Sequence, residues 1–149
     1  MTMKKGFTLI EMLVVISIIG VLVTISSFGL QGAREGARDS RRKSDLEAIR
    51  TALELYRSDC GRYPATLGAT LVGAGTPTRC AASNTYMAEV PADPLDPSHE
   101  YRYYQDPAST TTYQLCARLE DTALGDVVCG TGPASCGSSG NCNYRVVSP

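Results

Sequence analysis

The chain has 149 residues and a formal net charge of −1 at pH 7, with eight tyrosines, two phenylalanines and no tryptophan. This length leaves room for one domain beside a membrane segment, and the low aromatic content indicates a modest core. The sequence holds one histidine, His99, and no Cys-x-x-Cys pair among its six cysteines, so it gives little support for an enzyme or for a zinc site.

The first predicted element is an apolar helix over residues 7–28. At about 1.5 Å per residue this run spans roughly 33 Å, which is enough to cross the hydrocarbon core of a bilayer. Glu11 is its one ionisable residue. A carboxylate in a membrane segment is costly without a partner, so Glu11 predicts a functional pairing.

Two ordinary explanations of the apolar run stay open. A secretory signal has an apolar stretch of about 7–15 residues and then a small-residue cleavage site, whereas this run is longer and no Ala-x-Ala site precedes Gln31. A plain single-pass anchor fits the length, but it does not require Glu11 or the Gly6-Phe7 junction.

A basic collar follows the apolar run. Clustered cations attract nucleic-acid phosphates, but no aromatic residues are interleaved here to stack on bases. A positive-inside count would place this side in the cytoplasm, although acidic residues are interspersed. We expect a solvated collar and no nucleic-acid binding through this chain. The collar consists of Arg34, Arg38, Arg41, Arg42 and Lys43.

The helix is predicted to continue to about Asp59 as an amphipathic segment. Its apolar residues recur at helical spacings of three and four, and polar residues fill the other face. Gly61 can form a left-handed cap and Pro64 cannot continue the helix, so it should end near Cys60. The apolar stripe consists of Leu46, Ile49, Leu53 and Tyr56.

Short strands should cover this stripe. Tyr113, Leu115, Ala117 and Leu119 alternate with more polar residues, which is typical of a half-buried strand. Weaker candidates are residues 100–105, 126–129 and 143–147, whereas 66–83 and 130–141 read as loops. The predicted fold class is α+β: one long N-terminal helix packed on a small antiparallel sheet of three or four strands.

The six cysteines all follow the apolar run, which suits an oxidising compartment outside the cytoplasmic membrane. Six cysteines allow fifteen pairings, and the sequence does not choose among them. We favour nearest neighbours, with each bridge adding about 3 kcal/mol. The favoured pairs are Cys60 with Cys80, Cys116 with Cys129, and Cys136 with Cys142.

The start of the chain carries a specific motif. Two lysines, Lys4 and Lys5, precede the sequence GFTLIE of residues 6–11 and the apolar helix. This pattern resembles the N-terminus of type IV pilins and of the pseudopilins of type II secretion systems. The resemblance implies cleavage after Gly6 by a prepilin peptidase and methylation of the new amine at Phe7. Glu11 would then pair with the Phe7 ammonium of a neighbouring subunit.

Two later stretches resemble the heads of major pseudopilins and small pilins. They are CGRYP at residues 60–64 and VPADPLDP at 90–97, and the resemblance extends to about Leu119. It departs at Phe28, where many family members have proline. The implied organisation is a leader over 1–6, a helix over 7–60 with 7–28 in the membrane or filament core, and a globular head over 61–149.

The function that this resemblance implies is structural. We expect a pilin that is held in the cytoplasmic membrane with its head outside. An inner-membrane platform and its ATPase would then assemble it with other copies into a helical surface filament for adhesion or motility. The alternative is a type II secretion major pseudopilin in a periplasmic pseudopilus. A second alternative is a membrane-anchored binding module, which predicts no processing at Gly6.

The head offers few other candidate sites. His99 is expected to be a solvated loop histidine, and Asp93 and Asp96 are expected to shape turns around Pro94. No cofactor is expected except calcium. The family resemblance places calcium in a loop between late strands, where the weak candidates are Glu120, Asp121 and Asp126.

Overall fold

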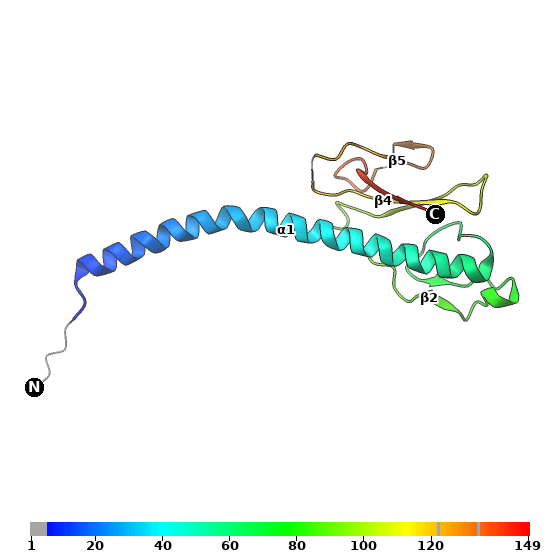
Figure 1. The fold of residues 1–149 in the computed structure, drawn as a ribbon, viewed down its shortest axis with the longest axis horizontal. Helices are drawn as coiled ribbons and strands as arrows, with labels where there is room; N and C mark the ends of the chain where they lie inside the picture. The colour runs from blue at the N-terminus through cyan, green and yellow to red at the C-terminus, as the bar shows by residue number, and fades with distance from the viewer. Residues whose placement is uncertain (1–5, 122, 134) are drawn as a thin grey trace, which may run out of the picture. The chain divides into compact units, whose positions relative to one another are not determined.

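The computed structural model describes residues 6–121, 123–133 and 135–149 (Figure 1). Apart from Gly6, the predicted leader with Lys4 and Lys5 lies outside the described residues. The chain divides after Ala37 into two compact units, the second being Arg38–Pro149. This division falls within helix α1 (Leu9–Cys60), which is helical throughout.

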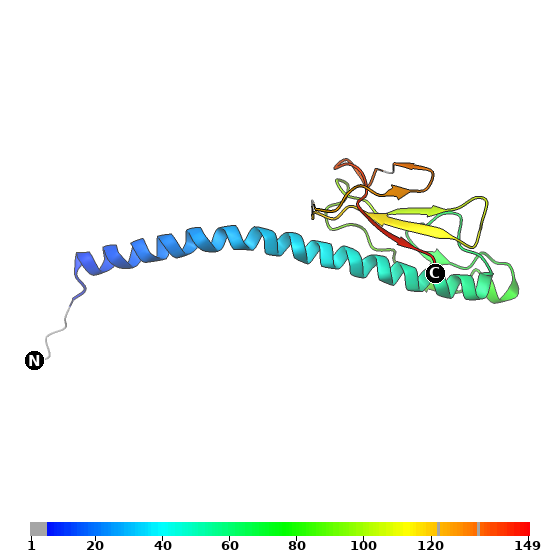
Figure 2. The ribbon, with the colours of Figure 1, turned by 45° about the horizontal axis from the view of Figure 1, so that its top comes forward.

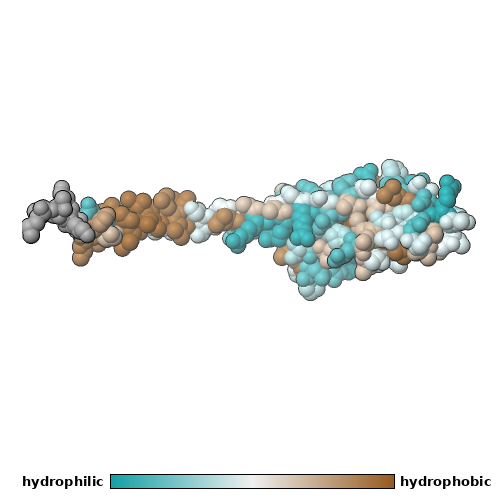
Figure 3. All heavy atoms as spheres, turned by 90° about the horizontal axis from the view of Figure 1, so that it is seen from below, coloured by the Kyte–Doolittle hydropathy of each residue, from teal (hydrophilic) through white to brown (hydrophobic). Residues whose placement is uncertain are grey.

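The part of α1 that precedes the division is exposed, and it is apolar over most of its length. Its large apolar side chains are exposed, from Leu9 at 83% to Ile25 at 67%. Figure 3 shows them as a brown, hydrophobic surface over the N-terminal stretch of the helix. By length and composition this helix can cross a membrane, and none of its most apolar window is buried in the chain. A single chain therefore leaves this surface for lipid or for other protein to cover.

The part of α1 within the second unit supports the core of the head. Leu46, Ile49 and Leu53 are fully buried and Tyr56 nearly so, whereas Leu55 on the other face is 55% exposed. The predicted apolar stripe is confirmed. The helix ends at Cys60 because Gly61 adopts a left-handed φ of 72° and donates its N–H to the carbonyl oxygen of Arg57 at 2.8 Å.

A three-stranded antiparallel sheet lies beside this part of the helix (Figure 2). It consists of β3 (Arg102–Gln105), β4 (Tyr113–Ala117) and β7 (Tyr144–Val147), in the order β3-β4-β7. In the register, Leu115 at the centre pairs with Tyr103 on one side and Val146 on the other. The residues of β4 that pack in the same core as the helix stripe are Tyr113, Leu115 and Ala117, as the alternation predicted.

Two short hairpins complete the head. β1 (Leu71–Val72) pairs with β2 (Thr85–Met87), and a 3₁₀ turn, η1 (Thr78–Cys80), lies between them. β5 (Val128–Cys129) pairs with β6 (Gly132–Pro133). The weak strand candidate over residues 126–129 is confirmed by β5, whereas β1, η1 and β6 fall where the sequence predicted loops. Strands of two residues are too short to produce a periodic pattern.

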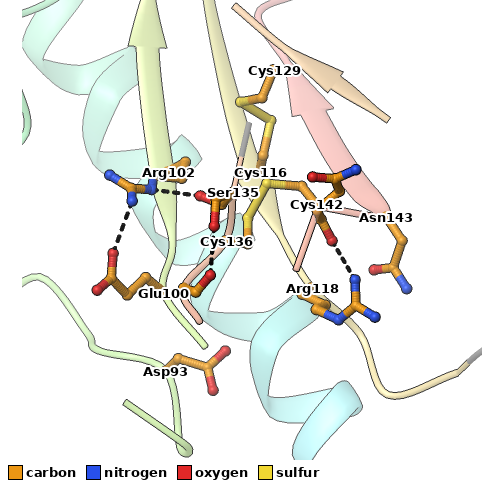
Figure 4. The surroundings of a disulfide bond; sticks show 12 residues. Asp93, Glu100, Arg102, Cys116, Arg118, Cys129, Ser135, Cys136, Cys142 and Asn143 are labelled. Atoms are coloured by element: carbon orange, nitrogen blue, oxygen red, sulfur yellow. Dashed lines mark hydrogen bonds and ion pairs between the residues drawn. A yellow bond between two sulfur atoms is a disulfide. The ribbon is translucent and has the colours of Figure 1, made fainter. Parts of the chain in front are cut away.

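Three disulfides link the six cysteines in the favoured nearest-neighbour pairs: Cys60–Cys80, Cys116–Cys129 and Cys136–Cys142. The last two bridges lie close together in a small core of their own (Figure 4). Tyr104 and Val127 pack against this core. Cys116 belongs to this second core, whereas its neighbour Leu115 belongs to the first. Strand β4 is therefore buried on both faces rather than on the single face that the sequence predicted.

Candidate functional site

The GFTLIE motif forms a helix start in which Thr8 and Glu11 are partners. The backbone N–H and the hydroxyl of Thr8 both donate to Glu11 Oε2, each at 2.9 Å. In return, the backbone N–H of Glu11 donates to the hydroxyl oxygen of Thr8, with 3.4 Å between nitrogen and oxygen. This is a capping box, in which the residue before the helix and the third helical residue satisfy each other's backbone N–H groups.

Sequence reasoning assigned no role to Thr8, although the signal was present. A serine or threonine three residues before a glutamate, at the start of an apolar run, is the usual pattern of a capping box. Within the single chain, Glu11 therefore has a local partner besides the intersubunit one that the resemblance implies.

Gly6 and Phe7 precede the helix in a segment without regular secondary structure. Gly6 is exposed and the Phe7 side chain is 79% exposed. A peptidase needs an extended, accessible backbone at the bond it cuts, and helical backbone begins only at Leu9. The local structure thus suits cleavage between Gly6 and Phe7.

A second polar site lies in the head, centred on Arg42, whose side chain is completely buried. Its Nε and Nη2 donate to the two carboxylate oxygens of Asp93 at 2.8 and 3.0 Å. Its Nη1 donates to Asp39 Oδ1 and to Glu120 Oε1, both at 2.7 Å. Arg38 also donates to Glu120, from Nε at 2.6 Å and from Nη2. We call these five residues the Arg42 cluster.

This cluster corrects the prediction of a solvated collar. Arg41 is solvated, with 66% of its side chain exposed, but Arg42 beside it is fully buried. The sequence did contain a sign of this burial. Arg42 lies four residues before Leu46 and seven before Ile49, so it falls on the same face of the helix as the apolar stripe. An arginine at a core position requires carboxylate partners, and the helix itself provides one of them, Asp39.

The loop after β4 is held from two sides. Asp39 accepts hydrogen bonds from the backbone N–H of Glu120, at 2.9 and 3.1 Å, and of Asp121, at 3.1 Å. On the other side Asn143 accepts the Leu119 N–H at 2.6 Å and donates to the carbonyl oxygens of Leu119 and Asp121. The cluster and Asn143 thereby fix residues 119–121.

The cluster changes the acidity of neighbouring groups. The pKa of Glu120 is lowered to about 2, chiefly by the hydrogen bonds from Arg38. Burial opposes this shift, and the hydrogen bond from Arg42 adds to it. Burial, followed by the positive charge of Arg42, lowers the pKa of His99. Glu120 is therefore ionised at neutral pH, and neutral His99 is favoured.

The prediction of a solvated His99 is wrong, since the residue is only 9% exposed. Its Nδ1 lies 3.3 Å from each of the hydroxyl oxygens of Ser98 and Ser139. The loop closed by the Cys136–Cys142 bridge covers it, with the Ser139 N–H donating to the Ser98 carbonyl oxygen at 3.0 Å. The expected turn role of Asp93 is present, because its Oδ1 accepts the Leu95 N–H at 2.9 Å.

The three weak calcium candidates do not assemble into a metal site. Glu120 faces two guanidinium groups, Asp121 Oδ1 accepts the Ala123 N–H, and Asp126 Oδ2 accepts from the Asn141 side chain. Among the described residues, no group of three or more His, Cys, Asp or Glu side chains is placed to hold a metal ion. A carboxylate already facing arginines is a poor ligand for a divalent cation.

An apolar helix with a methylation-type start, continuing into a small disulfide-linked α+β head, defines a pilin-like protein. Comparison with known families refines this class. The profile of the prokaryotic N-terminal methylation motif matches residues 1–27, and that of type II secretion system (T2SS) protein G matches residues 29–128. The chain belongs to the type II secretion system protein G family.

Curated relatives agree with this assignment. The chain is 40% identical over 127 residues to type II secretion system core protein G of Escherichia coli, covering 82% of this chain and 86% of that protein. It is 38% identical over 96 residues to the core protein G of Dickeya chrysanthemi, covering 61% of this chain and 63% of the relative, slightly under two thirds of its length. No solved structure matches the chain significantly.

These matches change the order of the two leading interpretations. The sequence favoured a type IV surface pilin and kept the secretion pseudopilin as the alternative, whereas the comparisons support the alternative better. The expected anchored precursor fits the apolar helix and the methylation motif. The expected extracellular filament does not follow from membership of a secretion family.

Proposed function

We propose that this chain is the major pseudopilin of a type II secretion system, a structural subunit that assembles with other copies into a periplasmic pseudopilus. The observation that carries the proposal is the match of protein G to residues 29–128, which covers the head as far as β5 and more than half of α1. The exposed apolar part of α1 supports it, because assembly would bury this surface against neighbouring helices.

The chemistry of assembly follows from the N-terminal motif. A prepilin peptidase cuts between Gly6 and Phe7, and the new Phe7 amine is methylated. As a subunit docks, Glu11 pairs with the Phe7 ammonium of its neighbour, which compensates a charge that is unfavourable in an apolar filament core. An inner-membrane platform with its ATPase supplies the energy, since exchanging lipid for protein contacts gives little hydrophobic gain.

Intact-mass spectrometry of the chain from its own host tests this function. A chain that begins at Phe7, carries one methyl group and stays in the cell fraction supports the pseudopilin. The same processed chain in filaments sheared from the cell surface would favour a surface pilin, and an unprocessed cell-bound chain would favour the simple membrane anchor. Deleting the gene should also stop type II secretion while leaving surface pili intact.

A further inference from the structure

Three carboxylates from separate segments of the second unit meet around the guanidinium of Arg42. Asp39 comes from α1, Asp93 from the loop before β3, and Glu120 from the loop after β4. Carboxylates from several segments that meet in this way repel one another unless a cation lies between them. Here the guanidinium of Arg42 lies between them, and it bonds to all three.

The same loop shows where other cation ligands would be found. Backbone carbonyl oxygens are common ligands of calcium, and Leu119 and Asp121 present two of them after β4. Both carbonyl oxygens accept from the amide of Asn143, at 3.0 and 3.3 Å. The oxygens that a cation could use therefore already have protein donors.

We propose that Arg42 and Asn143 replace a bound cation in this head, which therefore folds and holds its β4–β7 loop without calcium. The family resemblance implies a calcium site in a loop between late strands, and this chain departs from it. Two disulfides, Cys116–Cys129 and Cys136–Cys142, close most of the same connection covalently. The loop is thus fixed by arginine, amide and disulfide contacts.

Charge supports this replacement. The Arg42 cluster contains two arginines and three carboxylates, for a formal charge of −1 when all are ionised. Without Arg42 the same site would hold one arginine and three carboxylates, a charge of −2. Within the described part of the chain, no buried side-chain nitrogen or oxygen lacks a hydrogen-bond partner, so the cluster is satisfied as it stands.

The test is thermal unfolding of the full-length chain in detergent. Unfolding is monitored by the near-ultraviolet circular dichroism of the tyrosines. The protein is stripped with EGTA and measured with EGTA, with calcium, or with magnesium, each cation at about 5 mM, above the dissociation constants of weak calcium modules. We expect midpoints that agree within about 1 °C across all three conditions. A rise of about 4 °C or more in calcium alone would overturn the proposal.

Variants test the replacement itself. Arg42→Gln leaves three carboxylates around a neutral side chain, so its midpoint should fall in EGTA and partly recover in calcium. Arg41→Gln, at the exposed neighbouring position, should behave as the unmodified chain in every condition. A folded Arg42→Gln protein without any calcium recovery would refute the idea that the guanidinium occupies the position of a cation.

A second variant covers the case in which Arg42→Gln does not fold. Asn143→Asp replaces the amide donors to two carbonyl oxygens with a carboxylate, which should make stability depend on calcium. Asn84→Asp, in the β1–β2 connection, is the matched control and should show no such dependence. Equal responses to calcium in the two variants would also contradict the proposal.

Discussion

Arg42 and Asp93 lie 51 residues apart in the sequence and form a bidentate ion pair in which both side chains are fully buried. The pair joins helix α1 to the proline-rich loop that leads into β3. The two parallel bonds, at 2.8 and 3.0 Å, also fix the plane of the guanidinium, so Nη1 points at Asp39 and Glu120. One arginine thus sets the position of two loops.

Asp93→Asn should destabilise the head by about 3 kcal/mol, the lower end of the range for breaking a buried pair. The substitution keeps an oxygen for the Leu95 N–H but removes the charge opposite Arg42. The loss is at the lower end because Asp39 and Glu120 still accept from Nη1. Urea unfolding of the full-length chain, followed by tyrosine circular dichroism, measures it.

Asp96→Asn is the matched control for this prediction, because Asp96 lies in the same loop and is exposed. Its effect should stay within about 0.5 kcal/mol, as for most surface substitutions. Equal effects of the two variants would show that the buried pair contributes little to stability.

The pH dependence of stability should reveal Glu120. Its pKa falls from the ordinary value of 4.5 to about 2 in the folded head, chiefly through the hydrogen bonds from Arg38. A carboxyl whose pKa is lower in the folded state contributes stability above its unfolded pKa and loses it as the pH falls through the folded one. The unfolding free energy should therefore decline between about pH 4.5 and pH 2.

Glu120→Gln should flatten this decline, because the glutamine binds no proton in this range. Glu47→Gln is a suitable control, since the Glu47 side chain is 55% exposed and its contact with Arg50 is long, at 3.6 Å. The free energy of unfolding is compared at several pH values for the three proteins. A decline equally steep in Glu120→Gln would mean that other groups cause it.

Local patterns were sufficient to predict the helix stripe, the central strand and the fold class. Leu46, Ile49 and Leu53 recur at helical spacing, and Tyr113 and Leu115 at strand spacing, because each of these elements buries one face against a shared core. The nearest-neighbour disulfides were favoured among fifteen pairings that the sequence left open, and the structure contains these three, with sequence separations of 20, 13 and 6.

The environment of charged residues could not be predicted in the same way. Whether Arg42 is buried depends on Asp93 and Glu120, which arrive from loops 51 and 78 residues away. The burial of His99 likewise depends on a loop around Ser139, 40 residues further along the chain. A sequence pattern reports the face of an element, but it does not report which distant loop covers that face.

The two bridges of the small second core should differ in their contribution. Cys116–Cys129 closes a longer segment, with a sequence separation of 13 against 6 for Cys136–Cys142. From the entropy of the unfolded chain, replacing both cysteines of a pair by alanine should cost about 3 kcal/mol for the first bridge and about 2 kcal/mol for the second. Urea unfolding of the two double variants measures the order, and a reversed order would contradict this entropic account.

The role of Glu11 can be separated from that of its capping box. Glutamine also serves as the third helical residue of a capping box, so Glu11→Gln should keep the contacts with Thr8 and a normal helix start. It cannot neutralise the Phe7 ammonium of a neighbour. If charge pairing drives docking, Glu11→Gln and Glu11→Ala should both be processed to begin at Phe7 but assemble poorly.

The expected loss is large, because a buried pairing worth about 3 kcal/mol corresponds to about 100-fold in an association equilibrium. Intact-mass spectrometry checks the processing, and chemical cross-linking of neighbouring subunits in cells measures the assembly. Thr8→Val is the complementary variant, since it removes the hydroxyl of the cap and keeps the charge of Glu11. Normal assembly of Glu11→Gln together with failure of Thr8→Val would assign the role of the motif to helix capping rather than to charge pairing.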